Sequence, residues 1–381
     1  MNYQNLLKGF EVELFTGSLN CEHIGVASNV VNQLSNFEKE PDQRNIEYIT
    51  SPAYKYEELK PAILLPRHYL RQWLEDKNLT IIPGSTMSLD SSNSFQRSDP
   101  SNNYHEFIEL NYGTDVVTTS IHINLGLPDL SKLFAAVRLV RCEAALFLAL
   151  SASSPFLNGG NKGVHSQRWI QFPSTPNNVP FFLDYSHYVQ WIEEQLEQGI
   201  MFNERHLWCS VRPNGPRKPY ELNRLELRIC DLITDCDLLL AITALLELRV
   251  ISLISGDLQL DPLEYSQLSM NELIHLSNHN DLNAARFSLN ATLKHWKDGK
   301  AISCREWIQS IIEEVKPIAT KLNMLALLDP ITSTLKNGNQ SMKWLQSYSE
   351  GQSLKQILQN TMSEMVLEES LFLENEAMMR R

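Results

Sequence analysis

Acidic side chains recur in segments of the chain whose apolar residues alternate with polar ones. Glu11 and Glu13 lie two residues apart in GFEVELF, and Glu226 has a similar setting in RLELRICD. Such alternation predicts half-buried β-strands, and residues two apart on a strand project from the same face. Glu47, in IEYITSP, adds a carboxylate from another predicted strand. Mg²⁺ binds carboxylates together with waters and substrate phosphates, so these strands together predict a magnesium site.

A further predicted strand, SIHINLG, carries His122 and Asn124 on one face. If it pairs with the acidic strands, oxygen and nitrogen ligands converge on one surface. Each feature also has a structural interpretation. Carboxylates along one strand face usually form the solvated side of an antiparallel sheet, and a lone strand histidine is often a structural residue. The coincidence of four such strands favours the chemical interpretation.

Arginine side chains gather in the same strand-rich middle of the chain, at Arg168, Arg212, Arg224 and Arg228. A guanidinium group binds carboxylate or phosphate through two parallel hydrogen bonds. Arg228 is expected to face the same way as Glu226, so a cation and a metal ligand would share one wall. A structural salt bridge between these two neighbours is the open alternative.

The familiar nucleotide and hydrolase motifs do not occur in the sequence. There is no GxxxxGK[ST] loop, no GxGxxG after a predicted strand, no GxSxG and no HExxH. A nucleotide would therefore be held by another route, such as an acidic face bearing Mg²⁺. The net charge of −12 disfavours nucleic acid as a partner, because an acidic surface repels the phosphate backbone.

Predicted strands dominate the first half of the chain and predicted helices the second. The strands are expected at residues 9–15, 46–50, 79–83, 116–126, 207–213 and 222–231. Helices are expected from residue 129 onward, with Asp129 as a cap, and almost throughout after residue 231. This order indicates an α+β fold. We expect a single catalytic domain, 1–381, with a strand-rich active-site part, 1–231, and a helical part, 232–381.

The segment 84–107 is rich in Ser, Asn, Asp, Gly and Pro, which predicts a long loop. Long loops inside compact domains are often functional lids. A lid over the site and a disordered insert are both compatible with this composition.

Targeting signals are not found in the sequence. The N-terminal MNYQNLLKGFEVELF lacks the features of a signal peptide, and the longest apolar stretch, Leu238–Leu246, is far below the roughly 20 residues of a membrane span. The six cysteines form no CxxC pair. We therefore expect a cytoplasmic protein that needs no disulfide and no membrane. The oligomeric state cannot be read from the sequence.

These segments resemble the glutamate–cysteine ligases and related carboxylate–amine ligases. GFEVELF, IEYITSP and SIHINLG resemble three of their strands, and residues 212–231 resemble their RP…LELRxCD strand. Residues 148–169, LALSASSPFLNGGNKGVHSQRW, resemble their SASSPF…G…SxR segment, the most specific match. The matches keep their order from residue 9 to about 231. RSDPSNNYHEF and SIHINLG resemble the cyanobacterial type in particular.

The resemblance implies a glutamine-synthetase-like catalytic fold, in which a curved antiparallel sheet forms an active-site funnel. It implies that a set of acidic residues and one histidine face an Mg²⁺–ATP site: Glu11, Glu13, Glu47, His122 and Glu226. It assigns Arg168 and Arg228 to catalysis, and Arg212 with Arg168 to ATP binding. A second histidine of the more general ligases is replaced here by Asn124, which cannot act as acid or base and is left out of the ligand set.

The implied reaction joins the γ-carboxylate of glutamate to the amine of cysteine through a γ-glutamyl phosphate. It consumes ATP and would be the first step of glutathione synthesis. A ligase for another amine acceptor would use the same metal and ATP residues, so the sequence separates the two poorly. A non-catalytic protein on this fold would be expected to lose acidic ligands, and all of them are present.

Overall fold

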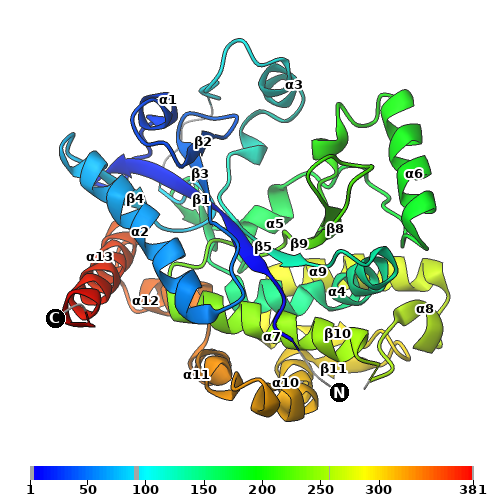
Figure 1. The fold of residues 1–381 in the computed structure, drawn as a ribbon. Helices are drawn as coiled ribbons and strands as arrows, with labels where there is room; N and C mark the ends of the chain where they lie inside the picture. Colours follow the sequence, from blue (N-terminus) through cyan, green and yellow to red (C-terminus); the bar gives the residue numbers. More distant parts are fainter. Residues whose placement is uncertain (1–3, 90–93, 257, 380–381) are drawn as a thin grey trace.

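The fold is built around one antiparallel sheet. The computed structural model describes residues 4–89, 94–256 and 258–379 (Figure 1). In this part of the chain the main sheet has the order β2-β3-β1-β5-β9-β8, and β4 pairs with the C-terminal end of β1, from Phe15 to Ser18. Its strands are β1 (Lys8–Ser18), β2 (Phe37–Lys39), β3 (Asn45–Ile49), β4 (Leu79–Ile82), β5 (Ile121–Gly126), β8 (Val211–Asn214) and β9 (Arg224–Leu227).

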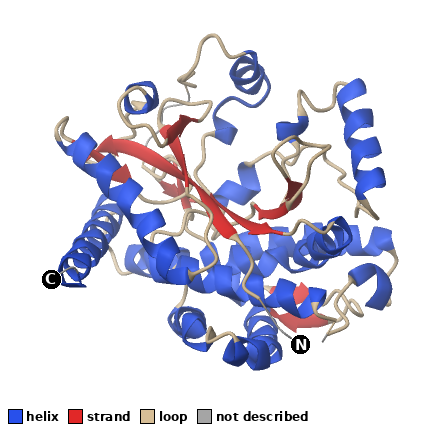
Figure 2. Ribbon diagram, viewed as in Figure 1, coloured by secondary structure: helices blue, strands red, loops and turns tan. Residues whose placement is uncertain are grey.

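Helices surround this sheet, and in Figure 2 they form most of the molecule outside the red strands. The first half of the chain contributes α1 (Ala27–Val31), α2 (Tyr56–Glu75), α3 (Asn103–Tyr112), α4 (Leu130–Ser151), α5 (Gln167–Gln171) and α6 (Tyr185–Glu197). The second half contributes α7 (Cys236–Ile254), α8 (Pro262–Tyr265), α9 (Met270–Phe287), α10 (Cys304–Lys321), α11 (Asp329–Asn337), α12 (Gln340–Ser349) and α13 (Leu354–Met379). Short hairpins are formed by β6 (Phe156–Leu157) with β7 (Gly160–Asn161) and by β10 (Thr292–Lys294) with β11 (Ala301–Ser303).

The long strand β1 separates the core from the polar face of the sheet. Phe10, Val12 and Leu14 point into the hydrophobic core and are almost fully buried. Glu11 and Glu13 alternate with them and therefore project from the opposite face. The alternation predicted from GFEVELF is thus confirmed.

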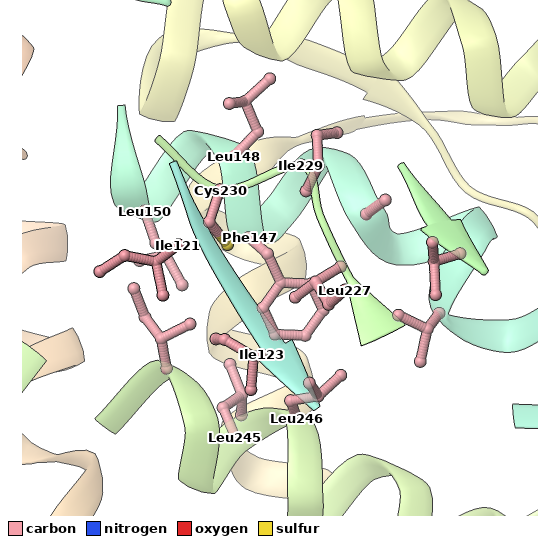
Figure 3. Packing of buried hydrophobic residues seen from close by; sticks show 14 of the residues in the cluster. Ile121, Ile123, Phe147, Leu148, Leu150, Leu227, Ile229, Cys230, Leu245 and Leu246 are labelled. Carbon is pink, nitrogen blue, oxygen red and sulfur yellow. The ribbon is translucent and has the colours of Figure 1, made fainter. Parts of the chain in front are cut away.

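The core under the sheet is supplied mainly by α4 and α7. Figure 3 shows Ile123 of β5 packed between Phe147 of α4 and Leu246 of α7. Asp129 caps α4 as predicted, since its side chain accepts a hydrogen bond from the Lys132 amide. The apolar run of α7 is a buried core helix. In the described part of the chain, no helix combines the length and apolar character needed to cross a bilayer.

The predicted strands are confirmed with different bounds: β1 is longer than predicted, β3 is shifted by one residue, and the other predicted strands are shorter. The strand expected at 116–126 begins only at Ile121, because Gly113–Val116 forms a 3₁₀ turn, η1. The expectation that helices begin at residue 129 is wrong. Helix α2 contains Pro61 and Pro66, which discourage a helical interpretation, yet its apolar face is buried and packs against α7 and β4.

The segment 84–107 is only partly a loop. Its beginning, residues 84–88, is buried, and the Thr86 hydroxyl donates to the Phe156 carbonyl over 2.7 Å. Its end forms the start of α3, whose first amides are capped by Asn102. Residues 90–93 lie outside the described residues. Residues 84–88 are therefore held in place by packing, and a lid in the later part of this segment stays a prediction.

All six cysteines are free thiols, as expected, and burial raises the pKa of each of them, for example Cys21 to about 11. One hydrophobic cluster extends from Phe10 on β1 to Met365 on α13. The division into an active-site part and a helical part stays a prediction.

Candidate active site

A cavity of about 190 Å³ lies over the polar face of the sheet. The strand register brings four of the five predicted ligands there, because Glu11 pairs with His122 across β1 and β5, and Glu13 pairs with Glu47 across β1 and β3. The fifth, Glu226, does not line the cavity. Residues directly opposite on antiparallel strands project from the same face. The cavity wall is completed by guanidinium groups from Arg168, Arg205, Arg212 and Arg228.

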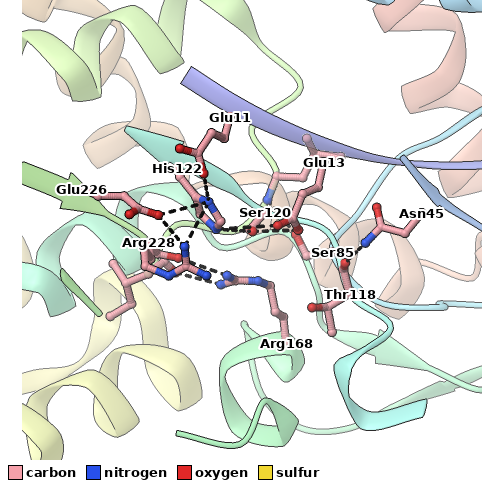
Figure 4. A network of polar contacts seen from close by, with 12 residues as sticks. Glu11, Glu13, Asn45, Ser85, Thr118, Ser120, His122, Arg168, Glu226 and Arg228 are labelled. Atoms are coloured by element: carbon pink, nitrogen blue, oxygen red, sulfur yellow. Dashed lines mark hydrogen bonds and ion pairs between the residues drawn. The ribbon is translucent and has the colours of Figure 1, made fainter. Parts of the chain in front are cut away.

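His122 is held between two carboxylates in the middle of this wall (Figure 4). Its Nδ1 lies 2.9 Å from Glu11 Oε2, and its Nε2 lies 3.6 Å from Glu13 Oε1. Ser120 donates to Glu13 over 2.8 Å and lies 3.1 Å from His122 Nε2. Burial and Glu226 raise the pKa of Glu11, but His122 and Arg228 outweigh them, so that this pKa is lowered.

A further group of carboxylates lies close together at the β2–β3 side of the cavity. Ligand oxygens of Glu13, Glu40 and Glu47 lie within 4.8 Å of one another, and Glu47 also belongs to a group with Glu11 and His122. Burial first, and neighbouring carboxylates second, raise the pKa of Glu40 to about 8 and that of Glu47 well above its ordinary value. Like charges gathered in this way repel, and a bound cation would offset the repulsion.

Glu226 is fully buried and surrounded by donors. Arg212 binds it through two hydrogen bonds of 2.7 and 3.2 Å, Asn214 donates over 2.6 Å, and Arg228 forms an ion pair with it. These guanidinium groups hold the pKa of Glu226 well below its usual range, against the effect of burial. The structural salt bridge left open between these two neighbours is thus present, and it is buried rather than exposed to solvent. Its partners favour Glu226 as an anchor for the two arginines, and its role as a metal ligand stays a prediction.

The arginines differ in how many of their donors are already used. Arg212 donates to Glu226 and to the carbonyls of Arg205 and Leu207. Arg168 donates to the carbonyls of Arg228 and Ile229 over 3.0 and 3.1 Å, and its buried Nε has no partner among the described residues. Arg168 and Arg228 therefore keep donors for a ligand, whereas Arg212 mainly orients Glu226.

Asp231 accepts hydrogen bonds from serines of the SASSPF segment, whose resemblance to the ligase family is the most specific. This fully buried carboxylate accepts hydrogen bonds from the Ser153 amide over 2.9 Å, from Ser154 over 2.7 Å and from Ser166 over 2.8 Å. Ser166 caps α5, the helix that carries Arg168. Asp231 thus fixes the position of Arg168, which also lies 3.8 Å from it.

Several residues of the site were not anticipated. Glu40 lies between strands, where no alternation marks it, and Asn214 and Asp231 act through their partners. Ser120 could have been found, because it precedes His122 by two residues and shares its face. Asn124, left out of the ligand set, donates to Glu11 over 3.2 Å and accepts from Arg224.

The family follows from comparison with known proteins. A family model described as glutamate-cysteine ligase family 2 (GCS2) matches residues 7–368. The chain belongs to this family. Among curated relatives of this GCS2 protein, one from Herpetosiphon aurantiacus named "Putative glutamate--cysteine ligase 2" is 26% identical over 346 residues, covering 87% of this chain and 85% of the relative. One from Legionella pneumophila, "Putative glutamate--cysteine ligase 2-1", is 26% identical over 373 residues, covering 94% and 96%.

Solved structures show the same fold in proteins of distant sequence. The glutamate–cysteine ligase of Francisella tularensis, determined in complex with AMP, has a TM-score of 0.76 at 13% identity, covering 97% of the GCS2 chain and 90% of its own. A bifunctional glutathione synthetase from Pasteurella multocida has a TM-score of 0.73 at 14% identity, covering 96% and 53%. At these identities the likeness shows the fold alone, and it confirms the predicted α+β ligase fold.

Replacing Asp231 by Ala should destabilise the protein strongly. The change leaves three buried donors without their acceptor, and breaking a buried charged network costs about 3–5 kcal/mol. We expect the melting temperature to fall by several degrees in a thermal melt. Asp76→Ala, at an exposed aspartate after α2, is the control and should melt as the wild type. Equal melting of both variants would contradict the anchoring role of Asp231.

Proposed function

We propose that this protein is an ATP-dependent ligase that joins the γ-carboxylate of glutamate to the amine of cysteine. The observation that carries the proposal is the cavity itself. It places four carboxylates and His122 on one side and donors of Arg168 and Arg228 on the other. Family membership and the fold shared with a glutamate–cysteine ligase solved with AMP support the same reaction.

The residues present fit Mg²⁺. The donors are carboxylate oxygens with one imidazole, and they are gathered in two groups that share Glu47. Glu11, Glu47 and His122 would form one position, and Glu13, Glu40 and Glu47 another. Bound Mg²⁺ would supply positive charge that offsets the phosphates of ATP. Crowded carboxylates without such a charge would repel both ATP and glutamate.

The guanidinium groups of the arginines would offset the negative charge of the phosphates and the substrate carboxylate during the reaction. An oxygen of the glutamate γ-carboxylate attacks the γ-phosphorus of ATP, and the bond from that phosphorus to the β–γ bridging oxygen breaks as ADP leaves. The amine then attacks the acyl carbon, the carbon–oxygen bond to phosphate breaks, and the amine loses a proton. Arg168 and Arg228 line the cavity, and their guanidinium groups would bind the phosphoryl oxygens or the substrate carboxylate.

Water must be kept from the acyl phosphate, or the intermediate hydrolyses. Helix α3 lies over the cavity, where Asn102, Tyr104 and His105 form part of its wall. The later part of segment 84–107 is therefore the candidate lid.

A ligase that uses another amine acceptor remains the alternative within this proposal. The expected cytoplasmic location and the expected absence of nucleic-acid partners stay predictions.

The direct test measures ADP release by the purified protein with Mg²⁺ and ATP. We expect release that depends on both glutamate and cysteine, with γ-glutamylcysteine formed in equal amount. A panel of other amino acids and amines serves as the comparison. ADP release that needs glutamate but prefers another amine would support the alternative acceptor. ADP release independent of glutamate would contradict the proposed reaction.

Glu11→Gln and Glu13→Gln test the metal assignment. Each change removes one negative ligand but keeps the shape of the side chain, so we expect the Mg²⁺ concentration needed for half-maximal rate to rise about tenfold or more. Thermal melting should change little. Glu58→Gln, at an exposed glutamate of α2, is the matched control. Wild-type magnesium dependence in both cavity variants would reject these residues as ligands.

A further inference from the structure

A second cavity adjoins the candidate active site. It has a volume of about 270 Å³ and is formed by α9, α5, the chain after α5 as far as Val179, the chain before β8 and one residue of α4. Phe172 and Trp208 belong to the walls of both cavities. A small molecule held in the second cavity would therefore lie beside the site where the acyl phosphate forms.

Asp281 is the unusual residue of this cavity. It projects from α9 together with Asn278 and Leu282, three positions that share one helix face. Its side chain is 5% exposed, and its Oδ1 has no hydrogen-bond partner among the described residues. Burial raises the pKa of Asp281 to about 8, although Arg141 and Ser210 oppose the rise. A buried carboxyl oxygen without a donor is costly to the fold, and a ligand that donates to it would remove the cost.

Arg141 of α4 presents the opposite charge to the same cavity. Its two Nη atoms donate to the carbonyls of Pro180 and Val179 over 2.7 Å each, which fixes the guanidinium group in place. Further N–H groups of the guanidinium remain for another acceptor. In the described part of the chain no salt bridge joins Arg141 to Asp281, although the charge of Arg141 is close enough to lower the pKa of Asp281.

The rest of the wall is aromatic. Trp169, Phe172 and Trp208 contribute rings, and the centroids of the last two lie 4.9 Å apart. Aromatic rings attract ammonium groups over their faces and also make favourable contacts with sulfur. One carboxyl group that a bound ammonium would keep ionised, one guanidinium group and an aromatic wall suit a small zwitterion better than a polyphosphate, which would need several cations.

We propose that this cavity binds the amino-acid amine acceptor, with Asp281 and Arg141 recognising its ammonium and carboxylate groups and the aromatic rings contacting its side chain. The inference rests on the proposed ligase function and deepens it, since neither the resemblance nor the active-site cavity assigns residues to the acceptor. Phe172 and Trp208, which line both cavities, then lie between the bound acceptor and the glutamyl group with which it reacts.

The test is the steady-state kinetics of Asp281→Asn with cysteine, glutamate and ATP varied in turn. We expect KM for cysteine to rise about tenfold or more, while KM for ATP and for glutamate stays within about twofold. Hydroxylamine, a small amine with neither a carboxylate nor a side chain, serves as an alternative acceptor. Formation of glutamyl hydroxamate should be unchanged. An unchanged KM for cysteine, or an equal loss with hydroxylamine and cysteine, would overturn the assignment.

A second variant keeps the test decisive if Asp281→Asn does not fold. Asn278 is exposed at the rim of the cavity, so Asn278→Trp should obstruct entry without disturbing the core. Its matched control is Asn271→Trp, at an exposed position of α9 that does not line the cavity. We expect only Asn278→Trp to raise KM for cysteine. Equal values in the two tryptophan variants would contradict the proposal.

Failure of the ligase function would be recognised separately. A wild-type protein that forms neither ADP nor hydroxamate rejects the proposed function. Equilibrium dialysis with radiolabelled cysteine then tests the cavity alone. Binding by the wild type that is lost in Asp281→Asn or Asn278→Trp would support the cavity as a site for a zwitterionic amino acid, and absence of binding by the wild type would overturn it.

Discussion

The register of β1 against β3 and β5 determines which side chains enter the active-site cavity. Glu11 lies opposite His122, and Glu13 lies opposite Glu47, so that two neighbouring pairs form one continuous ligand wall. A slip of one residue would place Phe10 and Val12 in the cavity and the carboxylates in the core. Burial of Phe10, Val12 and Leu14 in the hydrophobic core therefore fixes which side chains lie on the other face of β1, because burial and ligand position depend on the same alternation.

The charges of the site are arranged in two unlike groups. At β8 and β9 the charge of the buried Glu226 is balanced by Arg212 and Arg228 without a bound cation. At β1 and β3 the carboxylates have fewer cations, and the pKa of Glu47 is raised by burial and by its acidic neighbours. Such an imbalance is unfavourable for stability and is common at functional sites. The Glu226 group orients the guanidinium groups, and the carboxylates at β1 and β3 would be stabilised by a bound cation.

Much of this arrangement could be predicted from the sequence, because the alternation along each strand is local. The strand positions of Glu11, Glu13, Glu47 and His122 needed only the period of two, and the structure places all four on one wall. Arg228 could be predicted as a partner of Glu226 because it lies two residues away, whereas Arg212 and Asn214 could not, since they depend on the pairing of β8 with β9. Glu40 lies outside any regular element, and α2 was missed because its prolines oppose the local helical signal while tertiary burial stabilises the helix. In each of these cases contacts between residues far apart in the sequence determine the structure.

The central claim is that this cavity joins glutamate to an amine through an acyl phosphate. The most direct measurement uses glutamate labelled with ¹⁸O in its γ-carboxylate, with Mg²⁺, ATP and cysteine, and follows the label by mass spectrometry of the released phosphate. Transfer of the carboxylate oxygen to phosphorus requires one ¹⁸O atom in each phosphate formed with γ-glutamylcysteine. Phosphate that carries no label while the dipeptide accumulates would contradict the account.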